Sequence, residues 1–257
     1  MTRQIGAVMR KELAVTFTSP IFYAVAFIFL LISGYFFYSD VAYFNFLSLQ
    51  AASNPFIVEG LNPETMVIQP FFGNISIILL LMLPLLTMRL YAEEKKTGTI
   101  ELLFTYPLSD VATLTGKVLA TFAALLALLA AGFPCFLLFS TVSFVDWGMV
   151  GAGYLGLLLM GGAFVSLGVF TSSLTENQVV AAALSFGLLL LFWALGWAEP
   201  LVGGRAGQFL AHLAIASHLD SFAQGLVDTR DVLYYLCFGF FWLFLTLRSL
   251  NSRSWRG

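Results

Sequence analysis

The sequence predicts an all-α polytopic membrane protein in which six helices cross the bilayer, and three observations predict this fold class. Apolar residues make up 60% of the chain and charged residues only 10%, whereas a soluble domain carries about 25% charged residues. The apolar residues fall into six long uncharged runs, and runs of this kind suit membrane-spanning helices rather than barrel strands. The basic residues gather in alternate loops, as they do in chains that cross a membrane repeatedly.

The first element expected is an amphipathic helix at residues 1–19 that lies on the membrane surface. Its apolar side chains recur at near-helical spacing: Ile5, Val8, Met9, Leu13 and Phe17. The polar side carries Arg3, Arg10 and Lys11. Pro20 then begins the first span, where a missing N–H costs little. No small-residue cleavage site follows that run, so we expect no cleaved signal peptide.

One domain covering residues 1–257 is expected to hold all six spans. They are predicted at residues 21–38, 71–91, 118–140, 149–171, 179–198 and 232–248. The fourth span is rich in glycine, and two pairs of small residues four apart permit close helix approach: Ala152 with Gly156, and Gly162 with Ser166. We expect these pairs to pack against helices of the same chain rather than to form a seam between two copies.

Two stretches between the spans are expected to lie outside the membrane on the same side. Residues 39–70 contain Pro55 and Pro63, and we expect them to form an irregular loop. Residues 207–226 repeat the amphipathic spacing of the N-terminal segment, which predicts a re-entrant helix or a helix on the membrane surface.

The basic residues set the orientation of the chain. Ten of the twelve fall on the side that holds both termini: Arg3, Arg10, Lys11, Arg89, Lys95, Lys96, Lys117, Arg248, Arg253 and Arg256. The positive-inside rule assigns that side to the cytoplasm. We therefore expect a multi-pass protein with both termini cytoplasmic. The net charge of -2 indicates no nucleic-acid partner.

No group of residues in the sequence has the pattern of a catalytic or metal site. The predicted span cores contain no Asp, Glu, Lys, Arg or His, which argues against a proton-coupled transporter, because such proteins need titratable relays. His212 and His218 lie six residues apart without a zinc-protease motif, and we expect them to be ordinary polar residues. Cys135 and Cys237 lie in apolar runs and are expected to behave as small hydrophobic side chains.

A nucleotide site is also absent from the sequence. A phosphate-binding loop needs G-x-x-x-x-G-K-[ST], whose backbone amides surround the phosphates. Gly116-Lys117 is followed by Val118, and Val111 stands where the first glycine is required. We therefore expect the chain to bind no cofactor and to have no enzymatic activity of its own.

The segment 92–117, between the second and third spans, is the most informative polar part of the chain. The charged run before Gly98 extends the second helix, and Gly98 is expected to end it. Thr99 is expected to cap a short helix that exposes Leu102, Leu103 and Phe104 until Pro107 stops it. A solvated connector would have little reason to display these apolar side chains, so we expect a protein-docking element. Ser109 and Asp110 are expected to cap the next helix.

At these residues the sequence resembles the ABC-2 type permease family, whose members share E-x-x-x-G-T-[IL]-E-L-L-x-x-x-P-L-[ST] followed by Gly-Lys. The chain matches this pattern at twelve positions: Glu94, Gly98, Thr99, Ile100, Glu101, Leu102, Leu103, Pro107, Leu108, Ser109, Gly116 and Lys117. The opening Arg10-Lys11-Glu12-Leu13 and the ending from Phe222 to Tyr235 are similar too. Within the family the chain looks closest to the gliding-motility-associated branch.

The resemblance implies a fold similar to type V exporters, in the inner membrane of a bacterium. It implies a coupling helix at Thr99–Thr105 that docks on a separate cytosolic ATPase dimer, which would bind ATP and Mg²⁺. Glu94, Gly98 and the residues from Thr99 to Leu108 would serve this coupling, and Gly116 and Lys117 would lead the loop back into the membrane. The chain departs from the family at residues 172–178, which carry no basic residue for a second ATPase contact.

The resemblance also implies a second permease chain, either an identical copy or a paralogue such as one with a large external domain, with membrane lipid around the pair. Two functions fit this assembly. The first is a permease subunit that moves an unidentified substrate with ATP hydrolysed by its partner. The alternative is a membrane subunit that transports nothing and uses the strokes of the ATPase to regulate envelope or motility machinery.

Overall fold

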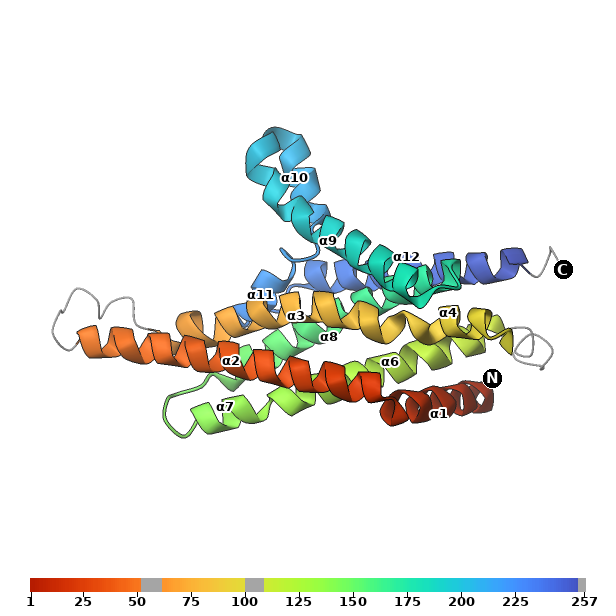
Figure 1. Cartoon of the computed structure of the whole chain (residues 1–257). Helices are drawn as coiled ribbons and strands as arrows, with labels where there is room; N and C mark the ends of the chain where they lie inside the picture. Colours follow the sequence, from red (N-terminus) through yellow and green to blue (C-terminus); the bar gives the residue numbers. More distant parts are fainter. Residues whose placement is uncertain (52–61, 100–108, 254–257) are drawn as a thin grey trace.

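The computed structural model describes residues 1–51, 62–99 and 109–253, and every regular element in these ranges is a helix. Six helices are long and apolar enough to cross a membrane: Pro20–Ala51, Glu64–Lys96, Asp110–Phe139, Trp147–Leu174, Gln178–Ala198 and Thr229–Asn251. The all-α fold class with six candidate spans is therefore confirmed. Figure 1 shows most of these helices running roughly alongside one another as a bundle, with Gln178–Ala198 inclined to the others.

The first two helices differ from expectation at one end only. Helix α1 (Thr2–Thr18) ends just before α2 (Pro20–Ala51), which begins at Pro20 as predicted. Helix α2 continues to Ala51, so residues 39–51 are helical and the prediction of an irregular loop there is wrong. The reason is local, since this stretch contains neither proline nor glycine and so nothing in it breaks a helix.

The second and third spans each contain a break. A π-helical turn, η2 (Glu64–Ile68), leads into α3 (Gln69–Thr87), so the predicted irregular loop is also wrong for residues 64–70. Helix α4 (Arg89–Lys96) follows after Met88. Helix α6 (Asp110–Gly132) gives way to α7 (Pro134–Phe139), where Pro134 has no N–H to continue the hydrogen-bond ladder.

Helix α8 (Trp147–Leu174) is the centre of the bundle. In its apolar span 72% of the residues are buried, against 17% in each of the last two spans. Its glycines allow neighbours to come close. A Cβ on Gly161 would lie 2.5 Å from Leu125 of α6, and one on Gly156 would lie 2.6 Å from Phe222. The predicted small-residue face therefore packs within the chain.

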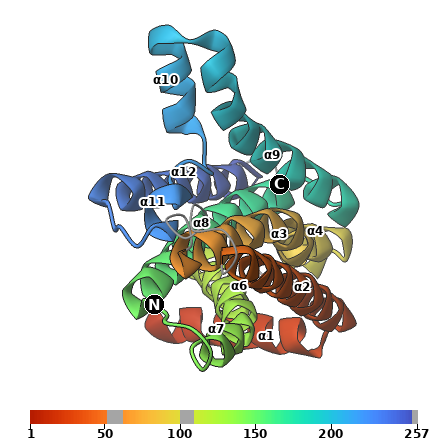
Figure 2. The same ribbon diagram turned by 90° about the vertical axis from the view of Figure 1, so that its left-hand side faces the viewer.

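The last third of the chain forms a helical hairpin, a short helix that packs on α8 and a final long helix. Helix α9 (Gln178–Val202) packs on α3 and α8 over its first part. Its last turns and α10 (Gly204–Leu213) project from the bundle in both views (Figures 1 and 2). Gly203 and Gly204 make the turn between them with φ of 64° and 58°, values that favour glycine. The short α11 (Leu219–Ala223) returns to pack on α8, and α12 (Thr229–Arg253) completes the bundle.

Helix α1, the end of α4 and the end of α12 lie at one end of the bundle, whereas α7, α11 and the start of α12 lie at the other (Figure 1). The base of the predicted docking segment therefore lies beside the N-terminal helix.

Candidate functional site

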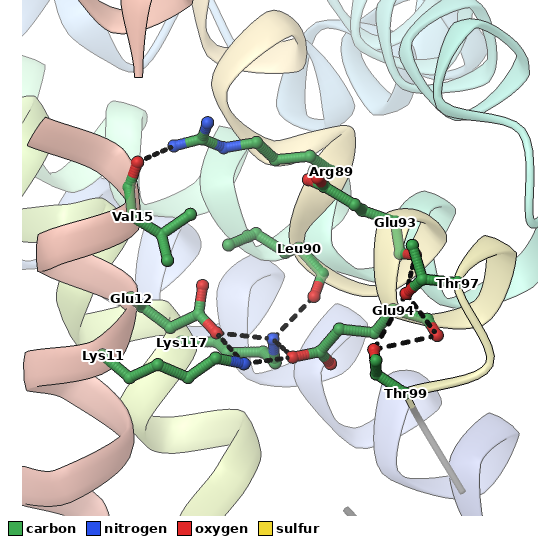
Figure 3. Close-up of a pocket in the computed structure, with 10 residues that line it drawn as sticks. All are labelled: Lys11, Glu12, Val15, Arg89, Leu90, Glu93, Glu94, Thr97, Thr99 and Lys117. Carbon is green, nitrogen blue, oxygen red and sulfur yellow. Dashed lines mark hydrogen bonds and ion pairs between the residues drawn. The ribbon is translucent and has the colours of Figure 1, made fainter. Parts of the chain in front are cut away.

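Four charged side chains from three distant parts of the sequence meet at the end of the bundle that holds α1. Lys11 and Glu12 come from α1, Glu94 from α4 and Lys117 from α6 (Figure 3). We call these four residues the ion cluster. Each belongs to a segment that carries the family resemblance described above. These segments are the opening Arg10-Lys11-Glu12-Leu13, the glutamate before Gly98, and Gly116-Lys117.

Lys117 is the centre of the ion cluster. Its Nζ lies 2.9 Å from Oε1 of Glu12 and 3.0 Å from Oε1 of Glu94. It also donates a hydrogen bond of 2.6 Å to the carbonyl oxygen of Leu90 and lies 5.0 Å from the ring centroid of Tyr91. Its side chain is only 1% exposed. A lysine buried this deeply needs carboxylate partners, because leaving the charge unpaired would be costly.

Lys11 closes the ion cluster from the solvent side. Its Nζ lies 2.7 Å from Oε1 of Glu94 and 3.4 Å from Oε1 of Glu12, and its side chain is 53% exposed. Burial acts to lower the pKa of Lys11, but the hydrogen bond and the charge of Glu94, together with those of Glu12, outweigh it and raise the pKa above its ordinary value. Two cations and two carboxylates thus balance within one small volume.

Gly116 explains why α1 and α6 can approach closely enough to form the ion cluster. A Cβ at this position would lie 2.7 Å from Cβ of Val8, which is closer than side-chain carbons pack. Val8 is itself buried on the apolar face of α1. The guanidinium of Arg89 adds a longer contact, 3.4 Å to the carbonyl oxygen of Val15. Helix α1 is therefore fixed to the bundle by packing as well as by charge.

Helix α4 is also held by α8, both at its first turn and near its end. The helical ladder breaks at Met88, and Ser172 of α8 completes it there. Its Oγ accepts hydrogen bonds from the amides of Tyr91 (3.0 Å) and Ala92 (3.1 Å) and donates one to the carbonyl oxygen of Met88 (2.8 Å). Lys95 donates to the carbonyl oxygen of Ser173. The sequence carries no signal that would identify Ser172, because its partners lie about 80 residues away.

The predicted docking segment begins where α4 ends. Gly98 has φ of 72° and stops the helix, as predicted. The hydroxyl of Thr99 turns back to α4 and donates to the carbonyl oxygen of Glu94 at 3.3 Å. Ser109 caps α6 as predicted, since its Oγ accepts from the amide of Ala112. The intervening predicted residues lie outside the described ranges: Ile100, Glu101, Leu102, Leu103, Phe104, Pro107 and Leu108.

Glu94, which the resemblance assigns to the ATPase coupling, faces the ion cluster. Its side chain is 10% exposed and its Oε1 lies 3.0 Å from Nζ of Lys117. In the described structure it joins α4 to α1 and α6. A cleft of about 180 Å³ lies beside it, lined also by Glu93, Thr97 and Thr99 (Figure 3). Within residues 1–51, 62–99 and 109–253, no group of His, Cys, Asp and Glu is arranged to hold a metal ion.

Comparison with known protein families gives one match. The family model for ABC-2 family transporter proteins matches residues 6–228, a stretch that includes all four residues of the ion cluster. None of the curated proteins compared with the chain matches it. The family match covers most of the chain and agrees with the six-span helical fold, so the chain is a membrane protein of the ABC-2 transporter family.

Proposed function

We propose that the chain is the permease subunit of an ABC transporter and moves its substrate with ATP hydrolysed by a separate cytosolic ATPase dimer. ATP and Mg²⁺ would bind to that partner, because the sequence contains no phosphate-binding loop. The ATPase would dock on the segment from Thr99 to Leu108. A second permease chain, identical or paralogous, would complete the membrane part.

The ion cluster supports this proposal most directly. A docking segment transmits force only if its base is attached to helices that move with it. Here α4, which leads into the segment, is joined to α1 and α6 through Lys117 and to α8 through Ser172. A force applied at Thr99 would therefore act on α1, α6 and α8 together, and not only on the loop that carries Thr99.

The proposed location is a bacterial inner membrane, with both termini and the ion cluster in the cytoplasm. The ten-to-two asymmetry of basic residues supports this orientation. Reporter fusions near residues 100, 175 and 255 should read cytosolic, and fusions near residues 55, 146 and 215 should read external. A cytosolic signal near residue 215 would contradict the six-span orientation.

The decisive experiment changes the docking segment without touching the membrane helices. Replacing Leu102 and Leu103 together by Asp would remove two apolar side chains, each worth about 1.5–3 kcal/mol when buried in a contact, and would place unpaired charges there. We expect the double variant to lose the ATPase in a pull-down from detergent-purified permease.

Two controls make the result interpretable. The double variant must elute as one symmetric peak in size exclusion, which shows that the membrane part is folded. Val142→Asp changes an exposed apolar residue outside the six candidate spans, in the turn that follows α7, and should recover the ATPase as the wild type does. Full recovery of the ATPase by the double Asp variant would contradict the docking role.

A further inference from the structure

The end of the bundle opposite the ion cluster has a charged pair of its own, built around His218. This residue lies just before α11, and its Nδ1 is 2.7 Å from Oδ1 of Asp231, in the first turn of α12. Its Nε2 is 3.1 Å from the carbonyl oxygen of His212, in the last turn of α10. The ring stacks on Tyr234, with centroids 3.8 Å apart. One imidazole thus joins three helices.

Both ring nitrogens of His218 face hydrogen-bond acceptors. A neutral imidazole carries only one N–H, so one of its nitrogens would point a lone pair at an acceptor oxygen. Only the imidazolium donates from both nitrogens, to the carboxylate of Asp231 and to the carbonyl of His212. The side chains of His218 and Asp231 are 13% and 11% exposed, so little water is present to replace a missing hydrogen bond.

The surrounding groups do not offer Asp231 another cation. Within the described ranges, His218 is the only basic residue within salt-bridge distance of Asp231. The other charged residues nearby are exposed: Arg230 lies on α12, Asp228 just before α12, and Asp220 on α11. The hydroxyls of Tyr234 and Tyr235 donate to the carbonyl oxygens of Leu213 and Ile215. Among the described residues, His218 is therefore the basic side chain that pairs with Asp231.

We propose that His218 and Asp231 form a proton-binding site that controls how firmly the α9–α10 hairpin is attached to α12. With the proton bound, His218 ties the end of α10 to the start of α12. When the proton leaves His218, one of the two hydrogen bonds is lost and a lone pair faces an oxygen. The tyrosine hydroxyls still hold the turn, so proton loss loosens the hairpin without unfolding it.

The phenyl ring of Phe222 explains why the loosening stays local. Phe222 is fully buried and packs against Gly156 of α8, so α11 remains attached whatever the charge on His218. The contact that loosens is then the one between His218 and the carbonyl oxygen of His212, at the end of α10. In the orientation proposed above this contact lies on the non-cytoplasmic side of the membrane, and the controlling proton comes from that side. The contact itself depends on neither the orientation nor an ATPase.

The test uses the full chain in lipid nanodiscs without a partner. The sequence has only two histidines, so histidine-selective ¹⁵N labelling reports the protonation of His218 directly, and His212→Gln assigns the signals. Spin labels at Gln208→Cys and Thr229→Cys, both exposed positions, report the distance between α10 and α12. Cys135→Ala and Cys237→Ala remove the native thiols.

Between pH 5 and 8, where imidazoles titrate, the distance distribution should be narrow when both His218 nitrogens carry protons. It should broaden as the same signals show proton loss. Asp231→Asn should abolish this pH response. His212→Gln is the matched control and should keep it, because only the backbone carbonyl of residue 212 takes part. If the distance distribution of the wild type stays unchanged while His218 loses its proton, the proposal is overturned. This outcome is independent of whether the ATPase docks on the segment proposed above.

Discussion

Lys117→Met tests whether the ion cluster holds the end of the bundle together. The change keeps the length of the side chain and removes the charge, which leaves Glu12 and Glu94 with Lys11 alone. Breaking a buried ion pair by removing one partner costs about 3–5 kcal/mol. Lys11 still lies 2.7 Å from Glu94, so we expect the lower value, about 3 kcal/mol. For a chain of this length that corresponds to a fall of about 6–12 °C in melting temperature.

The assay is thermal unfolding of detergent-purified protein at one fixed scan rate, because melting of such proteins is commonly irreversible. Lys11→Met is the matched control. Its side chain is 53% exposed, and exposed pairs contribute about 0–1 kcal/mol, so its melting temperature should fall by less than about 4 °C. Adding Glu12→Gln and Glu94→Gln to Lys117→Met should recover part of the loss, because no unpaired charge then remains buried. Equal effects of the two lysine changes, or no effect of Lys117→Met, would refute the reasoning.

Three further predictions concern the same end of the molecule. Gly116→Ala should lower the melting temperature, because overpacking costs about 1–3 kcal/mol, and adding Val8→Ala should restore part of it; failure of the second change to help would exclude that contact as the cause. Gly98→Ala should cost about 1–2 kcal/mol because of its left-handed backbone, whereas Gly151→Ala, in open space within a helix, should cost nothing in the same melting assay. The raised pKa of Lys11 means that its stabilisation is complete below its ordinary value of 10.5 and is lost only as the pH rises through the higher value of the folded state. The melting difference between wild type and Lys11→Met should therefore stay constant from pH 6 to 9, and a difference that vanished in that window would contradict this.

The features that the sequence predicted correctly are those that depend on a few neighbouring residues. The six spans follow from uncharged apolar runs, the end of α4 from Gly98, the start of α2 from Pro20, and the cap of α6 from Ser109. Each of these is decided by local backbone chemistry or by the hydrophobicity of a single segment. The length of α2 was not predicted, because Pro55 and Pro63 suggested an irregular loop for all of residues 39–70, although nothing in residues 39–51 breaks a helix.

The ion cluster could be predicted only in pieces. The resemblance includes Glu94 and Gly116-Lys117. Their contacts with Glu12 depend on how α1 packs against α6, and no local sequence pattern determines that packing. The same holds for His218, which was expected to be an ordinary polar residue and instead joins α10 to α12. Its spacing from His212 suggested no shared helical face, and its true partner, Asp231, lies 13 residues further along the chain.

The place of Lys117 in the chain has a consequence for biosynthesis. Helix α1 is synthesised before the third span, yet it packs against Gly116 and Lys117, which lie at the start of that span. Until that span has left the ribosome, Val8 cannot pack against Gly116. Until then, Lys11 is the only cation of the ion cluster that can pair with Glu12 and Glu94. Helix α1 therefore cannot complete its packing until the first two spans and the start of the third have been synthesised.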